Sequence, residues 1–208
     1  MTCRHHPHED LLLGYASGTL DEATSLVIAT HLTTCPRCRA DVAVAEAVGG
    51  ALLDEIAPAE IKCFAAIMNR LGEARFIASQ AYKNTGYPRT LDAYIPSAPI
   101  KWRRIGPGLR YASLLAEGHT RAGLLCCAPG ADVTLHTHDG EELTVVLAGA
   151  YNDGSEHFHC GDVQYADHTV LHRPVANREE GCTVLVVNKG RVRPTSFWAR
   201  LFMRFISI

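Results

Sequence analysis

A cluster of metal-binding residue types lies near the start of the chain. His31, Cys35 and Cys38 form an H-x3-C-x2-C motif. His31 leaves the same face of a predicted helix as Val27, four residues earlier, and Pro36 suits the first position of a second helix. The three side chains therefore converge at a corner between two helices, and thiolate and imidazole ligands suit tetrahedral Zn2+.

The fourth ligand of such a site has to come from another element, and the N-terminal segment is the obvious donor. That segment contains four candidates: Cys3, His5, His6 and His8. Four nitrogen and sulfur ligands would leave no open position, so the site would be structural rather than catalytic. The alternative is a free pair of buried cysteines beside a histidine that caps a helix.

A second constellation of metal-binding residue types lies in the second half of the chain. His136 and His138 would point to the same face of a strand, because side chains alternate along a strand. Glu142 follows a turn at residues 139–140, and His172 can close the set from a strand across the sheet. Three imidazoles and a carboxylate suit a divalent transition metal such as Zn, Fe, Mn or Ni. The alternative is solvated strand histidines and a surface carboxylate.

The elements that must position these side chains change type along the chain. Apolar residues spaced three and four apart predict four helices, over residues 11–16, 21–32, 36–56 and 59–71. Later, short apolar runs separated by Gly, Asp, Asn and Pro predict strands, over residues 109–115, 122–127, 133–138, 143–148, 156–159, 169–173 and 182–188. This order predicts an all-α small helical zinc bundle followed by an all-β antiparallel barrel.

A segment rich in turn residues separates the two halves. Pro and Gly recur through residues 72–108, which is typical of a linker and the entry to a second domain. We therefore expect two domains, residues 1–90 and residues 91–208.

The first half resembles a known family. The H-x3-C-x2-C motif on short helices, preceded by a histidine, is similar to the zinc-binding anti-sigma domain. The resemblance implies that Zn2+ is held by His6, His31, Cys35 and Cys38. It also implies that this domain grips a sigma factor of the extracytoplasmic-function type and keeps it off RNA polymerase.

The second half resembles the two cupin motifs, of which the first is essentially complete. The resemblance implies a jelly-roll barrel with His136, His138, Glu142 and His172 as ligands of a divalent metal, for which we expect Zn2+. The second motif departs from the family, because Asp-His-Thr at residues 167–169 stands where Pro-x-Gly is usual.

Together the two halves resemble the ChrR-type anti-sigma factors over nearly the whole chain. That resemblance implies a cupin sensor half and release of the sigma factor on singlet oxygen or organic peroxide. A metal-dependent cupin enzyme, a dioxygenase or isomerase, is the alternative, but it leaves the first 90 residues without a role. We therefore expect a transcriptional regulator that is not an enzyme.

Composition limits the other classes of function. The formal net charge is −2 over 208 residues, without a long basic block, which argues against direct binding of nucleic acid. No apolar run reaches the roughly 20 residues of a transmembrane helix, and we expect no signal peptide. The protein should be cytoplasmic, with its eight cysteines reduced by default. Cys160 and Cys182 are candidates for redox sensing, or else buried small apolar residues.

Two further stretches carry apolar stripes. Phe64, Ile67 and Met68 give helix 59–71 more apolar surface than a small bundle can bury, which favours contact with a partner. Residues 195–208 form a predicted amphipathic basic helix. We expect it to cover the cupin sheet. The alternatives are binding to an anionic membrane surface or docking on a protein partner.

Overall fold

The computed structural model describes residues 3–58, 62–73, 85–95 and 98–195. The helices come first along the chain: α1 (Glu9–Ala16), α2 (Glu22–Leu32), α3 (Pro36–Asp54), α4 (Phe64–Glu73) and the short 3-10 helix η1 (Arg89–Leu91). The strands follow: β1 (Arg103–Gly106), β2 (Leu109–Glu117), β3 (Thr120–Cys127), β4 (His136–His138), β5 (Glu141–Asp153), β6 (Glu156–His159), β7 (Val163–Ala166), β8 (Val175–Ala176), β9 (Cys182–Lys189) and β10 (Val192–Pro194). Residues 196–208, which make up all but the first residue of the predicted C-terminal helix, lie outside the described residues.

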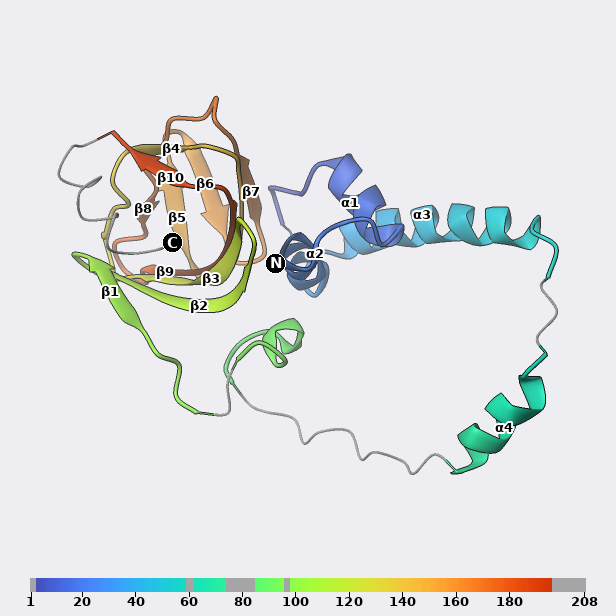
Figure 1. The fold of residues 1–208 in the computed structure, drawn as a ribbon. Coiled ribbons are helices and arrows are strands. Elements are labelled where there is room, and N and C mark those ends of the chain that lie inside the picture. The colour runs from blue at the N-terminus through green and yellow to red at the C-terminus, as the bar shows by residue number, and fades with distance from the viewer. Residues whose placement is uncertain (1–2, 59–61, 74–84, 96–97, 196–208) are drawn as a thin grey trace.

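The strands form an antiparallel barrel, which confirms the predicted fold class (Figure 1). The main sheet runs β1-β2-β3-β9-β5-β6, and β7 and β8 also pair with β5. A second, two-stranded sheet pairs β10 with β4. The long strand β5 pairs with β7 and β9 along its first part and with β6 and β8 near its end.

One predicted strand is wrong. Residues 169–173 hold only an isolated bridge, between His136 and His172. The backbone N–H and the hydroxyl of Thr169 both donate to the Asp167 carboxylate, at 2.8 and 2.6 Å. This Asx-type turn competes with extended structure, and Pro174 then lacks the N–H that a ladder needs.

The two helices beside the H-x3-C-x2-C motif begin with defined caps. The Asp21 carboxylate accepts from the backbone N–H of Thr24 at 2.9 Å and from its hydroxyl at 2.8 Å. At α3, Cys35 is the N-cap residue and Pro36 follows it. The backbone N–H of Cys38 points at the Cys35 sulfur, 3.5 Å away. This capping turn places both sulfurs on the same side of the helix start.

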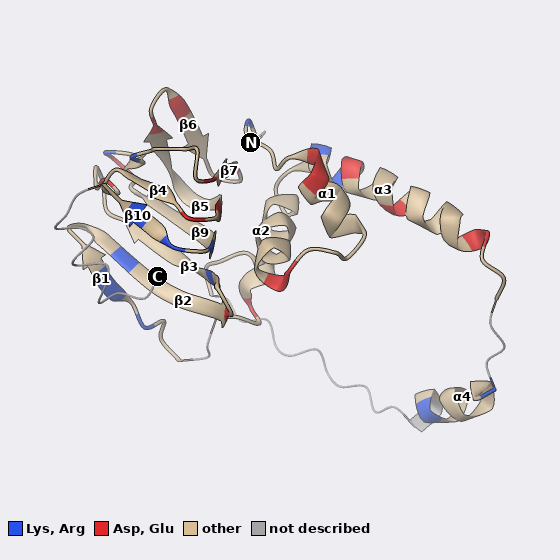
Figure 2. Ribbon diagram, turned by 45° about the horizontal axis from the view of Figure 1, so that its top comes forward, with Lys and Arg blue, Asp and Glu red and all other residues tan. Residues whose placement is uncertain are grey.

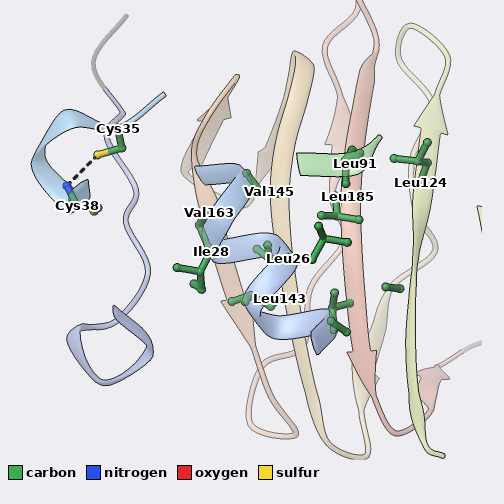
Figure 3. Packing of buried hydrophobic residues seen from close by; sticks show 14 of the residues in the cluster. Leu26, Ile28, Cys35, Cys38, Leu91, Leu124, Leu143, Val145, Val163 and Leu185 are labelled. Atoms are coloured by element: carbon green, nitrogen blue, oxygen red, sulfur yellow. Dashed lines mark hydrogen bonds between the residues drawn. The ribbon is translucent and has the colours of Figure 1, made fainter. Parts of the chain in front are cut away.

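The helical region and the barrel share one hydrophobic core (Figure 3). Helix α2 contributes Leu26, Val27 and Ile28, all buried, to the cluster that also contains residues of the strands. Figure 3 shows Leu26 and Ile28 beside the strands that carry Leu143, Val145, Val163 and Leu185. Burial on this scale, roughly 1.5–3 kcal/mol for each large side chain, holds α2 firmly on the sheet.

Helices α3 and α4 are far less buried. Within α3, only Cys38 and Val42 are buried. Helix α4 stands apart from the barrel and from α1–α3 (Figure 1). No helix in the described residues is both long enough and apolar enough to span a bilayer.

Candidate metal centres

The first candidate metal centre lies where the N-terminal segment meets the corner between α2 and α3. One ligand-type atom from each of His6, His31, Cys35 and Cys38 lies within 4.8 Å of the others. His6 Nδ1 is 3.4 Å from the Cys35 sulfur and 3.3 Å from the Cys38 sulfur. Nitrogen and sulfur ligands of one tetrahedral Zn2+ lie about 3.6 Å apart, given bond lengths of about 2.1 and 2.3 Å. The donor set therefore fits Zn2+.

His31 is fully buried and its ring is held in one orientation. Its Nδ1 lies 2.7 Å from the backbone carbonyl oxygen of Gly161, so Nδ1 carries the hydrogen and donates it. Nε2 is buried and has no hydrogen-bond partner among the described residues. A buried lone pair without a donor is costly, and a cation in this position would satisfy it. Burial also lowers the pKa of His31, which keeps the ring neutral, although the bond to Gly161 acts in the opposite direction.

The buried thiols of Cys35 and Cys38 also favour a cation in this position. Burial raises the pKa of Cys38 to about 12, and the neighbouring Cys35 thiol adds to that shift. Two thiolates would therefore not coexist here without a positive charge between them. A divalent cation supplies that charge and deprotonates coordinating thiols.

The other three N-terminal candidates lie outside this group of four. His8 is exposed, and it accepts from Asp10 as the N-cap residue of α1. His5 stacks on Phe158, with ring centroids 4.3 Å apart. The Cys3 sulfur lies 3.8 Å from the Thr34 hydroxyl, beside the site, and burial raises its pKa.

The second candidate metal centre lies inside the barrel. One ligand-type atom from each of His136, His138, Glu142 and His172 lies within 4.8 Å of the others. The Nε2 atoms of His138 and His172 are only 3.0 Å apart. Two imidazole ligands of one tetrahedral ion would be separated by about 3.3 Å, so this spacing fits a shared cation. The bridge between His136 and His172 brings the second motif to the first.

Outer partners orient two of these rings. His136 Nδ1 lies 2.8 Å from the carbonyl oxygen of Thr134, and His172 Nδ1 lies 2.7 Å from the Asp153 carboxylate. Metal-binding histidines usually donate their second N–H to such acceptors. Burial, together with neighbouring imidazoles, lowers the pKa of His136 and of His138 to about 4. Both rings are therefore neutral near pH 7, as metal ligands must be.

Glu142 is the acidic member of the set. Burial raises its pKa to about 7, and a neighbouring cation would favour its ionised form. A cavity of about 60 Å³ adjoins this carboxylate and is lined mainly by apolar side chains and by Cys127, Tyr151 and Cys182.

Neither redox candidate is an exposed, activated thiol. Burial raises the pKa of both Cys160 and Cys182, and the Cys160 thiol donates to the carbonyl oxygen of Leu147 at 3.2 Å. A reactive cysteine needs a lowered pKa and solvent access.

Three further residues contact these groups and were not predicted from the sequence. Asp153 accepts from His172, Gly161 accepts from His31, and Asp162 accepts from the backbone N–H groups of Arg4 and His5. Asp153 ends β5, and the other two form the turn between β6 and β7. The Gly-Asp pair between two short strands was the available signal, but it also fits an ordinary turn. The contacts of Gly161 and Asp162 join residues more than 100 positions apart.

Comparisons with known proteins show which family this chain belongs to. A family model described as the ChrR cupin-like domain matches residues 90–192, and a zinc-finger family model matches residues 8–39. The anti-sigma-E factor ChrR of Cereibacter sphaeroides is 40% identical over 215 residues, covering the whole of both chains. The chain belongs to the ChrR family of anti-sigma factors. The predicted family is therefore confirmed, and the protein is a regulator rather than an enzyme.

A solved structure agrees with this assignment. The crystal structure of Rhodobacter sphaeroides SigE in complex with the anti-sigma factor ChrR contains a chain with 40% identity. The TM-score is 0.79, and the match covers 89% of this chain and 99% of that ChrR chain. The likeness extends over the helical region and the barrel together.

Proposed function

We propose that this ChrR-family protein is a zinc-dependent anti-sigma factor that binds and inhibits an extracytoplasmic-function sigma factor. The observation that carries the proposal is the full-length match to ChrR, whose complex with SigE is known. The protein acts on the sigma factor in the cytoplasm and does not contact DNA directly. Binding occludes the surfaces that the sigma factor uses for RNA polymerase and promoter DNA.

Exposed apolar faces on α3 and α4 support a large protein partner. Phe64, Ile67, Met68 and Leu71 follow the spacing of one helix face, and between 44% and 62% of each is exposed. Val44, Val48 and Leu52 continue an exposed apolar stripe along α3. Figure 2 shows that charged residues take up only short parts of these two helices. Such faces are typical of helices that dock on a partner.

The N-terminal centre has a structural role in this proposal. His6, His31, Cys35 and Cys38 would hold Zn2+ with no open position, and the binding energy at such a site is folding energy. The site ties the N-terminal segment to the start of α3, the helix that carries part of the apolar stripe. His136, His138, Glu142 and His172 would hold a divalent transition metal in the cupin, which we assign as Zn2+.

The cupin is the sensing half, and its signal is oxidative: singlet oxygen or organic peroxide. Membership of the ChrR family supports this assignment. A set of contacts that leads out of the cupin centre supports a sensing role as well. The Asp153 carboxylate accepts from His172 at 2.7 Å and from the Gln164 amide at 2.6 Å. Gln164 in turn accepts from the Tyr151 hydroxyl at 2.7 Å.

The same contacts continue to the N-terminal segment. The Tyr151 ring stacks on Phe158, with centroids 4.8 Å apart, and Phe158 packs against His5 at 4.3 Å. His5 directly precedes His6 in the first centre. A change in the position of His172 therefore has a packed route to the segment that closes the zinc site.

Co-purification tests the proposed function. The full chain, expressed in its own cell with an affinity tag, should retain a sigma factor in stoichiometric amount. A Cys35→Ser, Cys38→Ser variant should lose it, and a His138→Ala variant should keep it. Recovery of the intact, folded protein without any sigma factor would refute the proposal.

A further inference from the structure

The turn between β6 and β7 of the cupin lies directly against the N-terminal metal centre. It comprises residues 160–162, and two of its residues contact the segments that carry His6 and His31. The contacts are to backbone groups and to one ring nitrogen, so they fix position rather than merely cover a surface.

Asp162 holds the N-terminal segment. Its side chain is almost fully buried, with 1% of the residue exposed. Oδ1 accepts from the backbone N–H of Arg4 at 2.7 Å and from that of His5 at 3.1 Å. Oδ2 accepts from the backbone N–H of His159 at 2.9 Å. The next residue, Val163, donates its backbone N–H to the carbonyl oxygen of His5 at 3.1 Å. His5, which immediately precedes His6, is thus hydrogen-bonded to the barrel through both its backbone N–H and its carbonyl oxygen.

Gly161 holds the second ligand. Its carbonyl oxygen accepts from His31 Nδ1 at 2.7 Å, which leaves Nε2 directed toward the metal position. Gly161 has φ of +92°, and a Cβ atom here would lie 2.7 Å from the Thr34 hydroxyl and 2.9 Å from the Cys3 sulfur. Both the backbone conformation and the close approach therefore require glycine.

We infer that the cupin supplies the outer shell of the N-terminal metal centre, with Gly161 and Asp162 as positioning residues for His31 and His6. Outer partners of this kind set the ring orientation and the metal affinity of the ligands they hold. Retention of the N-terminal metal is therefore a property of the whole chain, and a displacement of the β6–β7 turn loosens it. The inference rests on the N-terminal metal site that the proposed function includes.

Co2+ provides a probe that separates the two centres. The N-terminal centre contains thiolates and the cupin centre does not, so a thiolate-to-cobalt charge-transfer band reports only on the former. The full-length protein is loaded with Co2+ and challenged with excess chelator, and decay of this band is followed. Asp162→Ala and Gly161→Ala should lose the ion roughly 10-fold to 100-fold faster than wild type.

Two matched variants make the comparison specific. Gly154 also has positive φ, +60°, and lies in the turn between β5 and β6, but nothing stands within 4 Å of its Cβ position. Gly154→Ala pays a similar backbone cost without touching the centre and should decay at the wild-type rate. Asp162→Asn keeps an Oδ1 acceptor for Arg4 and His5 and should fall between wild type and Asp162→Ala.

The outcomes decide the inference separately from the proposed function. A normal band with equal decay rates in wild type, Asp162→Ala and Gly161→Ala overturns the inference and leaves sigma binding untouched. Equal acceleration in Gly161→Ala and Gly154→Ala also overturns it, because the effect would then be general strain. A wild-type protein without any thiolate–cobalt band refutes the metal site itself. If Asp162→Ala fails to fold, the two glycine variants still decide.

Discussion

Each centre depends on single residues that hold an imidazole in one tautomer. His31 donates to a backbone carbonyl, His136 donates to another, and His172 donates to the Asp153 carboxylate. In each case the hydrogen is committed to Nδ1, so Nε2 offers a lone pair to a cation. At the N-terminal centre the orphaned Nε2 of His31 and the two buried thiols lead to the same conclusion.

The cysteines of the first centre should matter for folding. Cys35→Ser with Cys38→Ser removes two of the four proposed ligands, and the binding energy that the proposed metal supplies would then be lost from the folded state. We expect loss of helical circular dichroism from the helical region and loss of inhibition in a sigma-dependent transcription assay. Cys63→Ser, at an exposed cysteine on the same half of the chain, should change neither. A double variant with native helicity and full inhibition would contradict this prediction.

At this scale the sequence predicts which side chains come together, and their role as metal ligands stays a prediction. The H-x3-C-x2-C and H-x-H-x3-E spacings bring their members together through local helix and strand geometry. The outer partners could not be predicted, because Gly161 reaches His31 from 130 residues away and carries no distinctive side chain. His6 could not be separated from Cys3, His5 and His8 by local geometry, and the structure brings His6 into the group of four.

Among the elements, α2 connects the two halves of the molecule. It caps itself with Asp21, buries its apolar face on β5 and β9, and carries His31 at its last turn. The Asp21 carboxylate also meets the Lys189 ammonium of β9 at 2.8 Å. One residue therefore both starts the helix and ties it to the barrel.

Asp21→Ala should destabilise this element by about 1 kcal/mol, mainly through the lost cap, because a partly exposed ion pair adds little. Burial raises the pKa of Asp21, but its bonds to Lys189 and Thr24 outweigh that effect and the net pKa is lowered. A lowered folded pKa means that this stabilisation is present above the unfolded value of about 4 and is lost as pH falls through the folded value.

Thermal denaturation at several pH values checks the Asp21 prediction. Asp21→Asn retains a capping oxygen but not the charge, so it should keep most of the stability and lose the pH-dependent part. The deficit of Asp21→Ala relative to wild type should shrink in acid. A deficit that is constant between pH 7 and pH 3 would show that the carboxylate charge plays no part.

Helix α4 should act in binding and not in stability. Phe64 and Met68 are 60% and 50% exposed, so Phe64→Ser with Met68→Ser removes little buried surface and should leave the melting temperature unchanged. If this face docks the sigma factor, truncating a central aromatic should cost roughly 2 kcal/mol, about 30-fold in Kd. Asn69→Ser on the same helix is the control. Unchanged affinity in the double variant would show that this face of α4 does not bind the sigma factor.

At the scale of the whole molecule, the sequence predicts two modules and the structure joins them. Helical periodicity and strand alternation are local signals, so they identify the bundle and the barrel separately. The packing of Leu26 and Ile28 against β5 and the fully buried Leu91 of η1 depend on how the two halves face each other. Periodicity shows that these side chains are buried but not which surface buries them.

The route from the cupin centre to the N-terminal segment gives the last prediction. Tyr151→Phe keeps the ring that stacks on Phe158 but removes the hydroxyl that donates to Gln164, which breaks the link to Asp153 and His172. Allosteric coupling energies are typically 1–3 kcal/mol, so losing one link should reduce induction by about 5-fold while basal repression survives. Tyr165→Phe removes a comparable bond, from an exposed hydroxyl to Glu141 at 3.1 Å, and should respond normally. A reporter driven by the sigma factor, with and without organic peroxide, measures both quantities.

Because the hydroxyl of Tyr151 touches neither the N-terminal segment nor any described part of α3 or α4, a loss of basal repression would mean that it supports the fold. Full induction in Tyr151→Phe would show that the signal crosses by another path, such as the face between α2 and the sheet.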